Sequence, residues 1–395
     1  MIFPRSSDQR QVLSSQELQD TNILSEFHGT TASLGKNTIF GYIKSLPIGN
    51  PLDDGSYEVY EQQLWIKDLS SDRQNTFSIG AVEEVYGKYN GSDLRLPFLT
   101  QGQESFIVAR YSQYDGETCI YFTNLKSFVT KKLKCLKYVD GFHRIMSQFI
   151  DGRYFIAASG HEYRQEAENK ENIRSKFNDI SHFIIINEQG HIESEKKFES
   201  KWGTDTSFDL FTDFNTFLQA YWWNDQYYFF HIRNNSGPLK VSTFDSKLNY
   251  LGTKILGYDY LIKHDARIYP LDFEFNSAAY VTILSLSGSP PNGLWSHSLM
   301  RVSLDSLEYE YEYFDTSTMN FDFKFNYHIS RSSNELVVAT QNFSGVFGED
   351  LKFREAVHLR YDSAPTMLIK GFKNPMAIWE SQTGISAGLV FICGQ

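Results

Sequence analysis

Two short segments combine aromatic side chains with carboxylates in a pattern that could bind a polar ligand. The first, KWGTDTSFD, contains Trp202, Asp205 and Asp209. The second, GYDYLIKHDARIYP, contains Tyr258, Asp259, Tyr260, His264, Asp265 and Arg267. Tyr and Trp rings stack on sugar faces, and carboxylates accept hydrogen bonds from sugar hydroxyls. Because Tyr, Trp and Arg are also enriched at protein–protein hot spots, the composition fits either a carbohydrate or a partner protein.

A third segment, GSPPNGLW, adds Trp295 to the candidate ligand-binding residues. Its two prolines restrict the backbone, so we expect a stiff loop that presents the indole ring to a ligand. The alternative is that Trp295 packs on a neighbouring sheet.

Glycoside hydrolysis is the enzymatic alternative to binding alone. It needs two carboxyl groups about 5 to 9 Å apart across the scissile bond. Asp205, Asp209, Asp265 and Asp315 are the candidate acids, because the links between successive repeated units could converge where they lie. Their spacing in the sequence does not identify any two of them as a catalytic pair. A similar motif in SFDLF, PLDFEF and NFDFKF puts Asp209, Asp272 and Asp322 in three successive units, where they could form a ring of acids or cap turns.

Motifs for other chemistry are absent from the sequence. It has no G-x-S-x-G elbow, no Gly-rich phosphate loop before a helix, no H-E-x-x-H and no calcium loop, so we expect no cofactor and no metal. Cys119, Cys135 and Cys393 are an odd number of cysteines without a short metal-binding spacing. They favour free thiols in a reducing compartment, with Cys393 as a buried thiol.

The elements that must position these residues are marked by an apolar run that occurs seven times. The runs start at Thr38, Ser105, Arg153, Tyr227, Ala279, Glu335 and Ala387, 48 to 74 residues apart. Such spacing is typical of a repeated multi-strand unit. An aromatic content of 16% favours strands over helices.

Each run is interpreted as the second of four antiparallel strands. A strand-like segment and a turn signal such as Asp151-Gly152 precede it, and a third strand and a fourth strand follow. Predicted third strands include LWIKDL from Leu64 and VHLRYD from Val357. Continuous apolar character suits a strand covered on both faces. The sequence therefore predicts an all-β fold, a β-propeller in a single domain over residues 1–395, with seven four-stranded blades or, alternatively, six.

The two ends of the sequence predict how the ring closes. The seventh run finishes at Cys393, so its blade should lack outer strands, and the N-terminal segments 1–3 and 11–13 are strand-like. We expect these N-terminal strands to complete the last blade.

Loops between second and third strands should share one face, and four are long: 45–63, 160–181, 285–298 and 341–356. Long loops gathered on one face are typical of function, although tolerated insertion is the alternative. The prediction is thus a non-catalytic binding module that recognises a partner protein or glycan on this face.

Charge and hydropathy indicate which classes of binding partner are unfavourable for this chain. The net charge of −11 and an isoelectric point of about 5.4 argue against nucleic acid. The nearest basic cluster, Lys131, Lys132, Lys134 and Lys137, is interpreted as a solvated strand edge or a loop. No apolar run approaches 18 residues and the N-terminus lacks a signal core, so we expect no membrane insertion and, by default, a cytoplasmic location. The alternatives are a signal that has been removed and export by another route.

Overall fold

The structure is a computed structural model that describes most of the predicted strands. The described residues are 29–34, 37–49, 59–68, 70–83, 98–112, 117–138, 144–163, 177–201, 215–233, 239–256, 267–276, 279–289, 294–315, 328–332, 335–339, 344–356, 367–369, 376–381 and 384–389. The chain divides into two compact units, Met1–Phe217 and Leu218–Gln395, which are described separately. The single domain over residues 1–395 stays a prediction.

In the first unit the described strands form three antiparallel sheets, A to C, of four strands each. Sheet A contains β1 (Gly29–Leu34), β2 (Asn37–Ile48), β3 (Val59–Asp68) and β4 (Gln74–Glu83). Sheet B contains β5 (Phe98–Gln101), β6 (Ser105–Ser112), β7 (Glu117–Asn124) and β8 (Val129–Lys137). Sheet C contains β9 (Arg144–Ile150), β10 (Arg153–Tyr163), β11 (Phe177–Asn187) and β12 (Ile192–Lys201).

In the second unit the described strands form sheets D to G, of which the last has three strands. Sheet D contains β13 (Asn215–Trp223), β14 (Gln226–Arg233), β15 (Leu239–Asp245) and β16 (Tyr250–Leu256). Sheet E contains β17 (Arg267–Phe275), β18 (Tyr280–Ser289), β19 (Leu294–Ser303) and β20 (Tyr309–Asp315). Sheet F contains β21 (His328–Ser332), β22 (Glu335–Ala339), β23 (Ser344–Gly348) and β24 (Phe353–Ala356), and sheet G contains β25 (Met367–Ile369), β26 (Met376–Ser381) and β27 (Gly384–Leu389).

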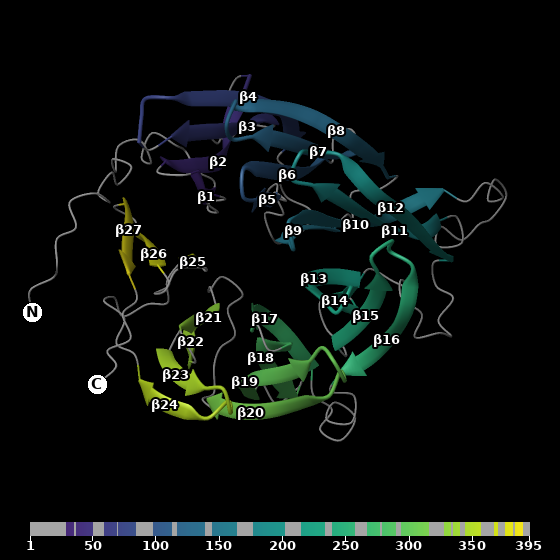
Figure 1. Ribbon diagram of the computed structural model, residues 1–395, viewed down its shortest axis with the longest axis vertical. Coiled ribbons are helices and arrows are strands. Elements are labelled where there is room, and N and C mark those ends of the chain that lie inside the picture. Colours follow the sequence, from purple (N-terminus) through teal and green to yellow (C-terminus); the bar gives the residue numbers. More distant parts are fainter. Residues whose placement is uncertain are drawn as a thin grey trace, which may run out of the picture. The chain divides into compact units, whose positions relative to one another are not determined.

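Every sheet is a meander whose strand order follows the chain, as Figure 1 shows for each group of consecutive labels. Repeated antiparallel meanders of four strands are the blades of a β-propeller, so the predicted all-β propeller fold is confirmed. The number of blades in the complete propeller stays a prediction. The segments predicted to close the ring, 1–3 and 11–13, lie outside the described residues.

Neighbouring sheets bury both faces of the strands between them. In β6, Phe106 and Val108 pack in a cluster with sheet A, whereas Ile107 packs in a cluster with sheet C. In β7, Tyr121 faces the first cluster and Ile120 the second. Alternate residues point to opposite faces of a strand, so covering both faces produces the continuous apolar run seen in the sequence.

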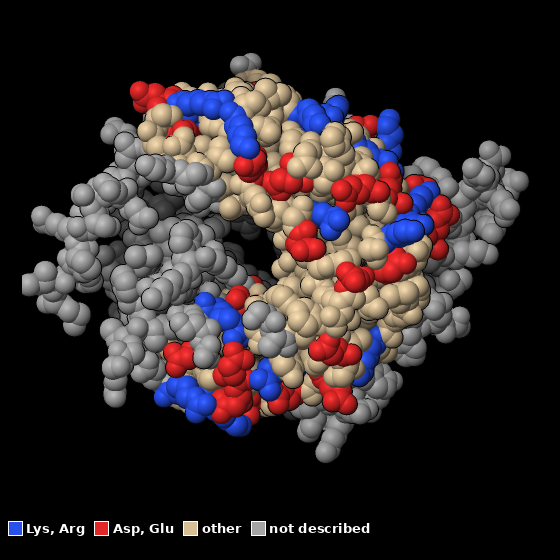
Figure 2. All heavy atoms as spheres, viewed as in Figure 1, with Lys and Arg blue, Asp and Glu red and all other residues tan. Residues whose placement is uncertain are grey.

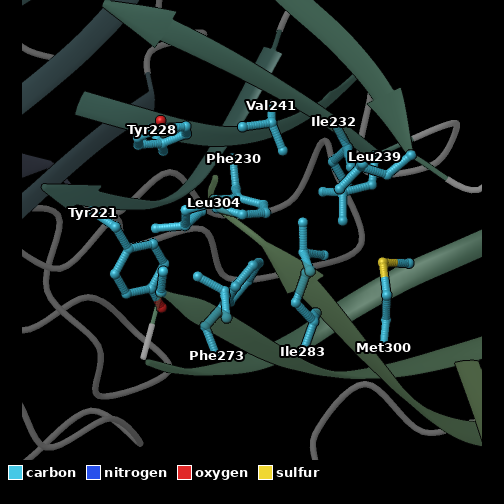
Figure 3. Packing of buried hydrophobic residues seen from close by; sticks show 14 residues of the cluster. Tyr221, Tyr228, Phe230, Ile232, Leu239, Val241, Phe273, Ile283, Met300 and Leu304 are labelled. Atoms are coloured by element: carbon cyan, nitrogen blue, oxygen red, sulfur yellow. The ribbon is translucent and has the colours of Figure 1, made fainter. Parts of the chain in front are cut away.

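The second unit repeats this packing between sheets D and E. Phe230 and Val241 of sheet D meet Phe273, Ile283 and Met300 of sheet E in one buried cluster (Figure 3). The Phe230 and Phe273 ring centroids lie 5.6 Å apart in an edge-on arrangement, which is a favoured aromatic geometry. Leu284 and Leu299, on the other face of sheet E, pack in a separate cluster with sheet F.

Carboxylates in the turns between third and fourth strands add polar ties between neighbouring sheets. We call Glu188, Asp305 and Glu349 the inter-sheet carboxylates. Glu188 Oε1 accepts hydrogen bonds from the Glu104 N–H (2.6 Å) and the Ser105 hydroxyl (2.8 Å) in the β5–β6 turn.

The other two inter-sheet carboxylates make the same kind of contact in the second unit. Asp305 Oδ1 accepts from Trp223 Nε1 (2.7 Å) and Asn224 Nδ2 (2.8 Å) in the β13–β14 turn. Glu349 Oε2 accepts from Asn276 Nδ2 (3.3 Å), which follows β17, and its other oxygen pairs with Arg331. In each case a carboxylate in the last turn of one sheet accepts hydrogen bonds from the first turn of the preceding sheet.

Three expectations about the strands are corrected. The seventh apolar run overlaps β27, a third strand, because second and third strands are apolar for the same reason. The third strand of sheet F is β23, not the segment from Val357, and β23 and β24 occupy the expected loop 341–356. The expected loops 160–181 and 285–298 are shortened because the flanking strands extend to Tyr163 and Phe177, and to Ser289 and Leu294.

The contacts of Glu188 predict that its replacement will destabilise the protein more than the replacement of a neighbouring residue in the same turn. The substitution Glu188→Ala should lower the free energy of unfolding by about 2–3 kcal/mol, because it leaves the Glu104 N–H and the Ser105 hydroxyl without their charged acceptor. Urea unfolding followed by fluorescence measures this. Gln189→Ala, in the same turn with an exposed side chain, is the control and should change stability by less than about 0.5 kcal/mol. Equal effects of the two substitutions would contradict the assigned role.

Candidate functional site

The end of sheet E nearest the β18–β19 connection brings together two of the predicted site residues. At this end β17 begins at Arg267, β18 ends at Ser289, β19 begins at Leu294 and β20 ends at Asp315. Trp295 therefore lies in a strand, not in the loop expected from its prolines. We call this region the sheet E end.

Strand register puts the candidates on two lines across the sheet E end, which are two residues apart along the strands. On the first line Arg267 is opposite Gly288, and Gly288 is opposite Trp295. On the second line Leu286 is opposite His297, which in turn is opposite Asp315. Residues directly opposite in antiparallel strands belong to the same face of the sheet. Gly288 therefore lies between Arg267 and Trp295 on the first line, and a glycine inside a strand often marks the close approach of a ligand or of another backbone.

A buried polar layer lies next to these register lines. His297 is 1% exposed, and the hydroxyls of Ser285 and Ser298 are buried and 2.9 Å apart. One of these hydroxyls donates to the other, so each has a hydrogen-bond partner inside the protein. By register, the Ser285–Ser298 pair belongs to the opposite face of the sheet from Gly288 and Trp295.

Asp272, one of the acids of the possible ring, has a structural role. It lies on β17 beside a register shift, where Oδ1 accepts from the Phe273 N–H (2.8 Å) and Oδ2 from the Ile329 N–H of β21 (2.9 Å). A carboxylate that accepts backbone hydrogen bonds through both oxygens braces two strands. The other two acids of that set, Asp209 and Asp322, lie outside the described residues.

Most of the predicted ligand-binding residues lie outside the described part of the chain. They are Trp202, Asp205, Asp209, Tyr258, Asp259, Tyr260, His264 and Asp265. Arg267 and Trp295 are described as members of β17 and β19.

A hydrogen-bonded His–Ser pair occurs in sheet D and was not found from the sequence. His231 Nε2 lies 2.8 Å from Ser242 Oγ, which is also 2.7 Å from Thr253 Oγ1. Such a pair could activate a nucleophile, but a triad needs an acid at the other imidazole nitrogen. His231 Nδ1 is buried without a hydrogen-bond partner, and both residues are 0% exposed, so we assign the pair to the core. Burial lowers the pKa of His231 to about 3, with Lys240 adding to the effect.

A partly buried histidine, His182, lies between sheets B and C. The His182 ring meets Tyr138 edge-on at 5.8 Å, and its Nδ1 is 3.9 Å from Glu195 Oε1. Burial lowers the pKa of His182, although Glu195 and Glu162 oppose that shift. Neutral imidazole is the stable form here, which suits a packing role.

Charged residues on the outer strands form ion pairs between and within sheets. Lys134 of β8 pairs with Glu195 of β12, and Lys352 pairs with Glu312 of β20, both at 2.6 Å. Figure 2 shows Lys and Arg interspersed with Asp and Glu over the described sheets of the face in view. Lys131, Lys132 and Lys137 are exposed on β8, the last strand of sheet B, which confirms the predicted strand edge.

The cysteine expectation is wrong for two of the three residues. Cys119 of β7 and Cys135 of β8 are opposite each other in the sheet and form a disulfide across a separation of 16 residues. The prediction missed this pair because strand register brings the two together. Cys393 lies outside the described residues. Within the ranges that the structure describes, no helix has the length and apolar character needed to cross a bilayer.

Comparison with known proteins finds similarity only among solved structures. No protein-family model matches the sequence, and no curated protein matches it. An acylaminoacyl peptidase in complex with Z-Gly-Gly-Phe-chloromethyl ketone is 11% identical, with a TM-score of 0.47 over 95% of this chain and 52% of that one. The β-propeller domain of the trilobed protease from Pyrococcus furiosus is 10% identical, with a TM-score of 0.43 over 93% and 96%.

Hydrazine synthase from Kuenenia stuttgartiensis is 8% identical, with a TM-score of 0.46 over 87% of this chain and 97% of that one. The chain spans about half the length of the acylaminoacyl peptidases that it resembles.

His231 predicts how stability depends on pH. Its pKa is about 3 when folded and 6.5 ordinarily, so between these values the unfolded chain binds a proton that the folded chain does not. Stability is retained above pH 6.5 and falls as pH falls through this window. From about pH 7 to about pH 5 the native protein should lose about 2 kcal/mol more stability than a His231→Gln variant.

Urea unfolding at the two pH values measures this difference, and the carboxylates common to both proteins cancel in the comparison. Since the pKa of His182 is also lowered, His182→Gln is a second variant expected to flatten the pH dependence, independently of the first. If the native protein and the His231→Gln variant lost stability in parallel, His231 would not be neutral in the folded state.

Proposed function

We propose that this chain is a non-catalytic binding module in which the sheet E end contacts a partner protein or a glycan. The observation that carries the proposal is the register line of Arg267, Gly288 and Trp295. On this line Arg267 and Trp295 lie on the two strands that flank Gly288. Arg and Trp are the side chains most often found at binding hot spots, and Trp also stacks on sugar rings.

The location of this line supports a binding role. It lies at the end of the sheet, beside the connection between β18 and β19, and two residues along the strands from the line that contains the buried His297. A rigid strand scaffold holds binding residues with less loss of conformational freedom than a loop does. The ligand would therefore meet residues whose backbone is already ordered.

The arrangement of acids favours binding over glycoside hydrolysis. Among the described residues on the two register lines, Asp315 is the one carboxylate, whereas hydrolysis needs two. Asp272, the nearby acid on β17, has both oxygens committed to backbone N–H groups. A binding module needs only one acid here, to accept a hydroxyl, amide or cationic group.

The test substitutes the two residues of the register line and measures binding. The wild-type protein is first screened on a glycan array and, in parallel, by crosslinking to candidate protein partners followed by mass spectrometry. For each ligand found, Trp295→Ala and Arg267→Ala should each raise Kd by about tenfold or more, a loss of about 1.4 kcal/mol or more. Tyr250→Ala is the matched control, because Tyr250 is an aromatic residue 42% exposed on β16 of another sheet.

The outcomes separate the proposal from its rivals. Array hits that Trp295→Ala abolishes support a glycan ligand, and a purified partner whose affinity falls in both variants supports a protein ligand. Turnover of a bound glycan that Asp315→Asn abolishes would establish the enzyme and refute the non-catalytic role. Unchanged affinity in both variants would refute the sheet E end as the site.

A further inference from the structure

The β7–β8 hairpin carries three metal-binding groups within reach of one another. Cys119 and Cys135 are opposite in register, and their Cα atoms are 4.1 Å apart. Glu117, two residues before Cys119 on β7, places Oε2 3.8 Å from the Cys119 Sγ. One ligand atom from each of the three residues lies within 4.8 Å of the others.

These separations match the donor spacing of a tetrahedral zinc ion. With Zn–S distances of about 2.3 Å, two thiolates on one ion lie about 3.8 Å apart, and a thiolate and a carboxylate oxygen about 3.5 Å apart. The first value is close to the Cα separation of the paired strands, so two cysteine side chains extending in parallel would reach it. The second is close to the Glu117–Cys119 distance.

We propose that the Cys119–Cys135 pair is a redox-gated zinc site. In the oxidised protein the two sulfurs form a disulfide. In the reduced protein Cys119, Cys135 and Glu117 bind one Zn²⁺, and a water molecule occupies the fourth position. Thiolate donors select zinc over magnesium and calcium, which prefer oxygen-only sites.

The step between the two states balances with an external thiol reductant such as glutathione. The thiolate of one reductant molecule attacks a sulfur of the disulfide, breaks the S–S bond and forms a mixed disulfide. A second thiol resolves it and leaves two cysteine thiols and one oxidised reductant disulfide. Two electrons and two protons are thereby transferred to the cysteines. Zinc then displaces both thiol protons, so that metal binding releases two protons to solvent.

The surroundings permit this exchange. Cys119 is 3% exposed, whereas Cys135 is partly exposed on β8, the edge strand of sheet B, so Cys135 is the more accessible of the two to a reductant. Two thiolates and one carboxylate around Zn²⁺ leave a net charge of −1. Lys137 Nζ, 3.1 Å from Glu117 Oε1, offsets that charge while the other carboxylate oxygen remains directed to the cysteines.

The test measures zinc binding to the full chain in both redox states, in a Cys393→Ser background that removes the third thiol. Protein reduced with a phosphine, desalted under inert gas and titrated with Zn²⁺ against a chromophoric chelator should bind one equivalent with a Kd of about 1 µM or tighter. Disulfide-bonded protein should bind none at this position. Co²⁺ in place of Zn²⁺ should give thiolate-to-metal charge-transfer absorption only in the reduced protein.

Variants assign the ligands. Cys135→Ser, at the partly exposed position, should abolish the charge-transfer band, and Glu117→Gln should keep the band but weaken zinc binding about tenfold or more. Glu193→Gln on β12 is the matched control and should change nothing. Circular dichroism establishes that each variant is folded.

Three results would overturn the proposal. They are reduced protein that binds no zinc, binding that survives Cys135→Ser, and binding that is equal in the oxidised protein. If Cys135→Ser does not fold, protection of the wild-type thiols from alkylation by Zn²⁺ decides the same question. Equal alkylation rates with and without zinc would then refute the site.

Discussion

The structure depends on covering both faces of a four-stranded sheet with its neighbours, as sheets B and E show. A single meander of this kind has two apolar faces, and neither can be left to water without losing the main favourable contribution to folding. Sheet B shows the consequence, since alternate residues of β6 and β7 belong to clusters with sheet A and with sheet C. Sheet E is buried in the same way between D and F. Sheets B and E bury their two faces through clusters shared with both neighbouring sheets, so packing between successive sheets holds this part of the fold together.

This constraint decides where polar residues can be used. Polar groups inside the sheets find hydrogen-bond partners there, as Ser285 and Ser298 do with each other and Ser242 does with His231. The turns and strand ends lie outside the two covered faces and can hold carboxylates. The inter-sheet carboxylates use this freedom to connect neighbouring sheets, and Arg267 and Trp295 lie at the ends of their strands in sheet E. The proposed binding role therefore belongs to the strand ends, whereas the apolar runs form the scaffold.

Much of the fold was predictable because double-sided burial leaves a continuous apolar signal in the sequence. The first six runs are second strands, as predicted. The seventh run overlaps β27, a third strand. It was assigned wrongly because third strands such as β7 are buried in the same way as second strands and have the same continuous apolar sequence. β23, with the sequence SGVFG, was missed for the opposite reason, since it is short and its glycines weaken the strand signal.

The site was less predictable, because it depends on register between strands. That Arg267 and Trp295 share a line through Gly288 follows from the pairing of β17, β18 and β19, which spacing along the chain does not encode. The Cys119–Cys135 pair was missed in the same way. The inter-sheet carboxylates do have a pattern in the sequence, because an acid recurs in the turn after the third strand at Glu188, Asp305 and Glu349. The partner of each acid belongs to the preceding sheet, so the sequence of a single sheet does not reveal the contact.

Edge strands explain why covalent or ionic links concentrate on the outside of the sheets. β8 pairs with β7 on one side only, so a single ladder of hydrogen bonds holds it to sheet B. The disulfide adds a link across that ladder, and the ion pair between Lys134 and Glu195 adds one to sheet C. An exposed ion pair contributes little on its own, whereas a covalent or metal link resists separation of the strands directly. Cys119 and Cys135 therefore lie where a change of redox state alters attachment of the outer strand while the doubly buried strands remain packed.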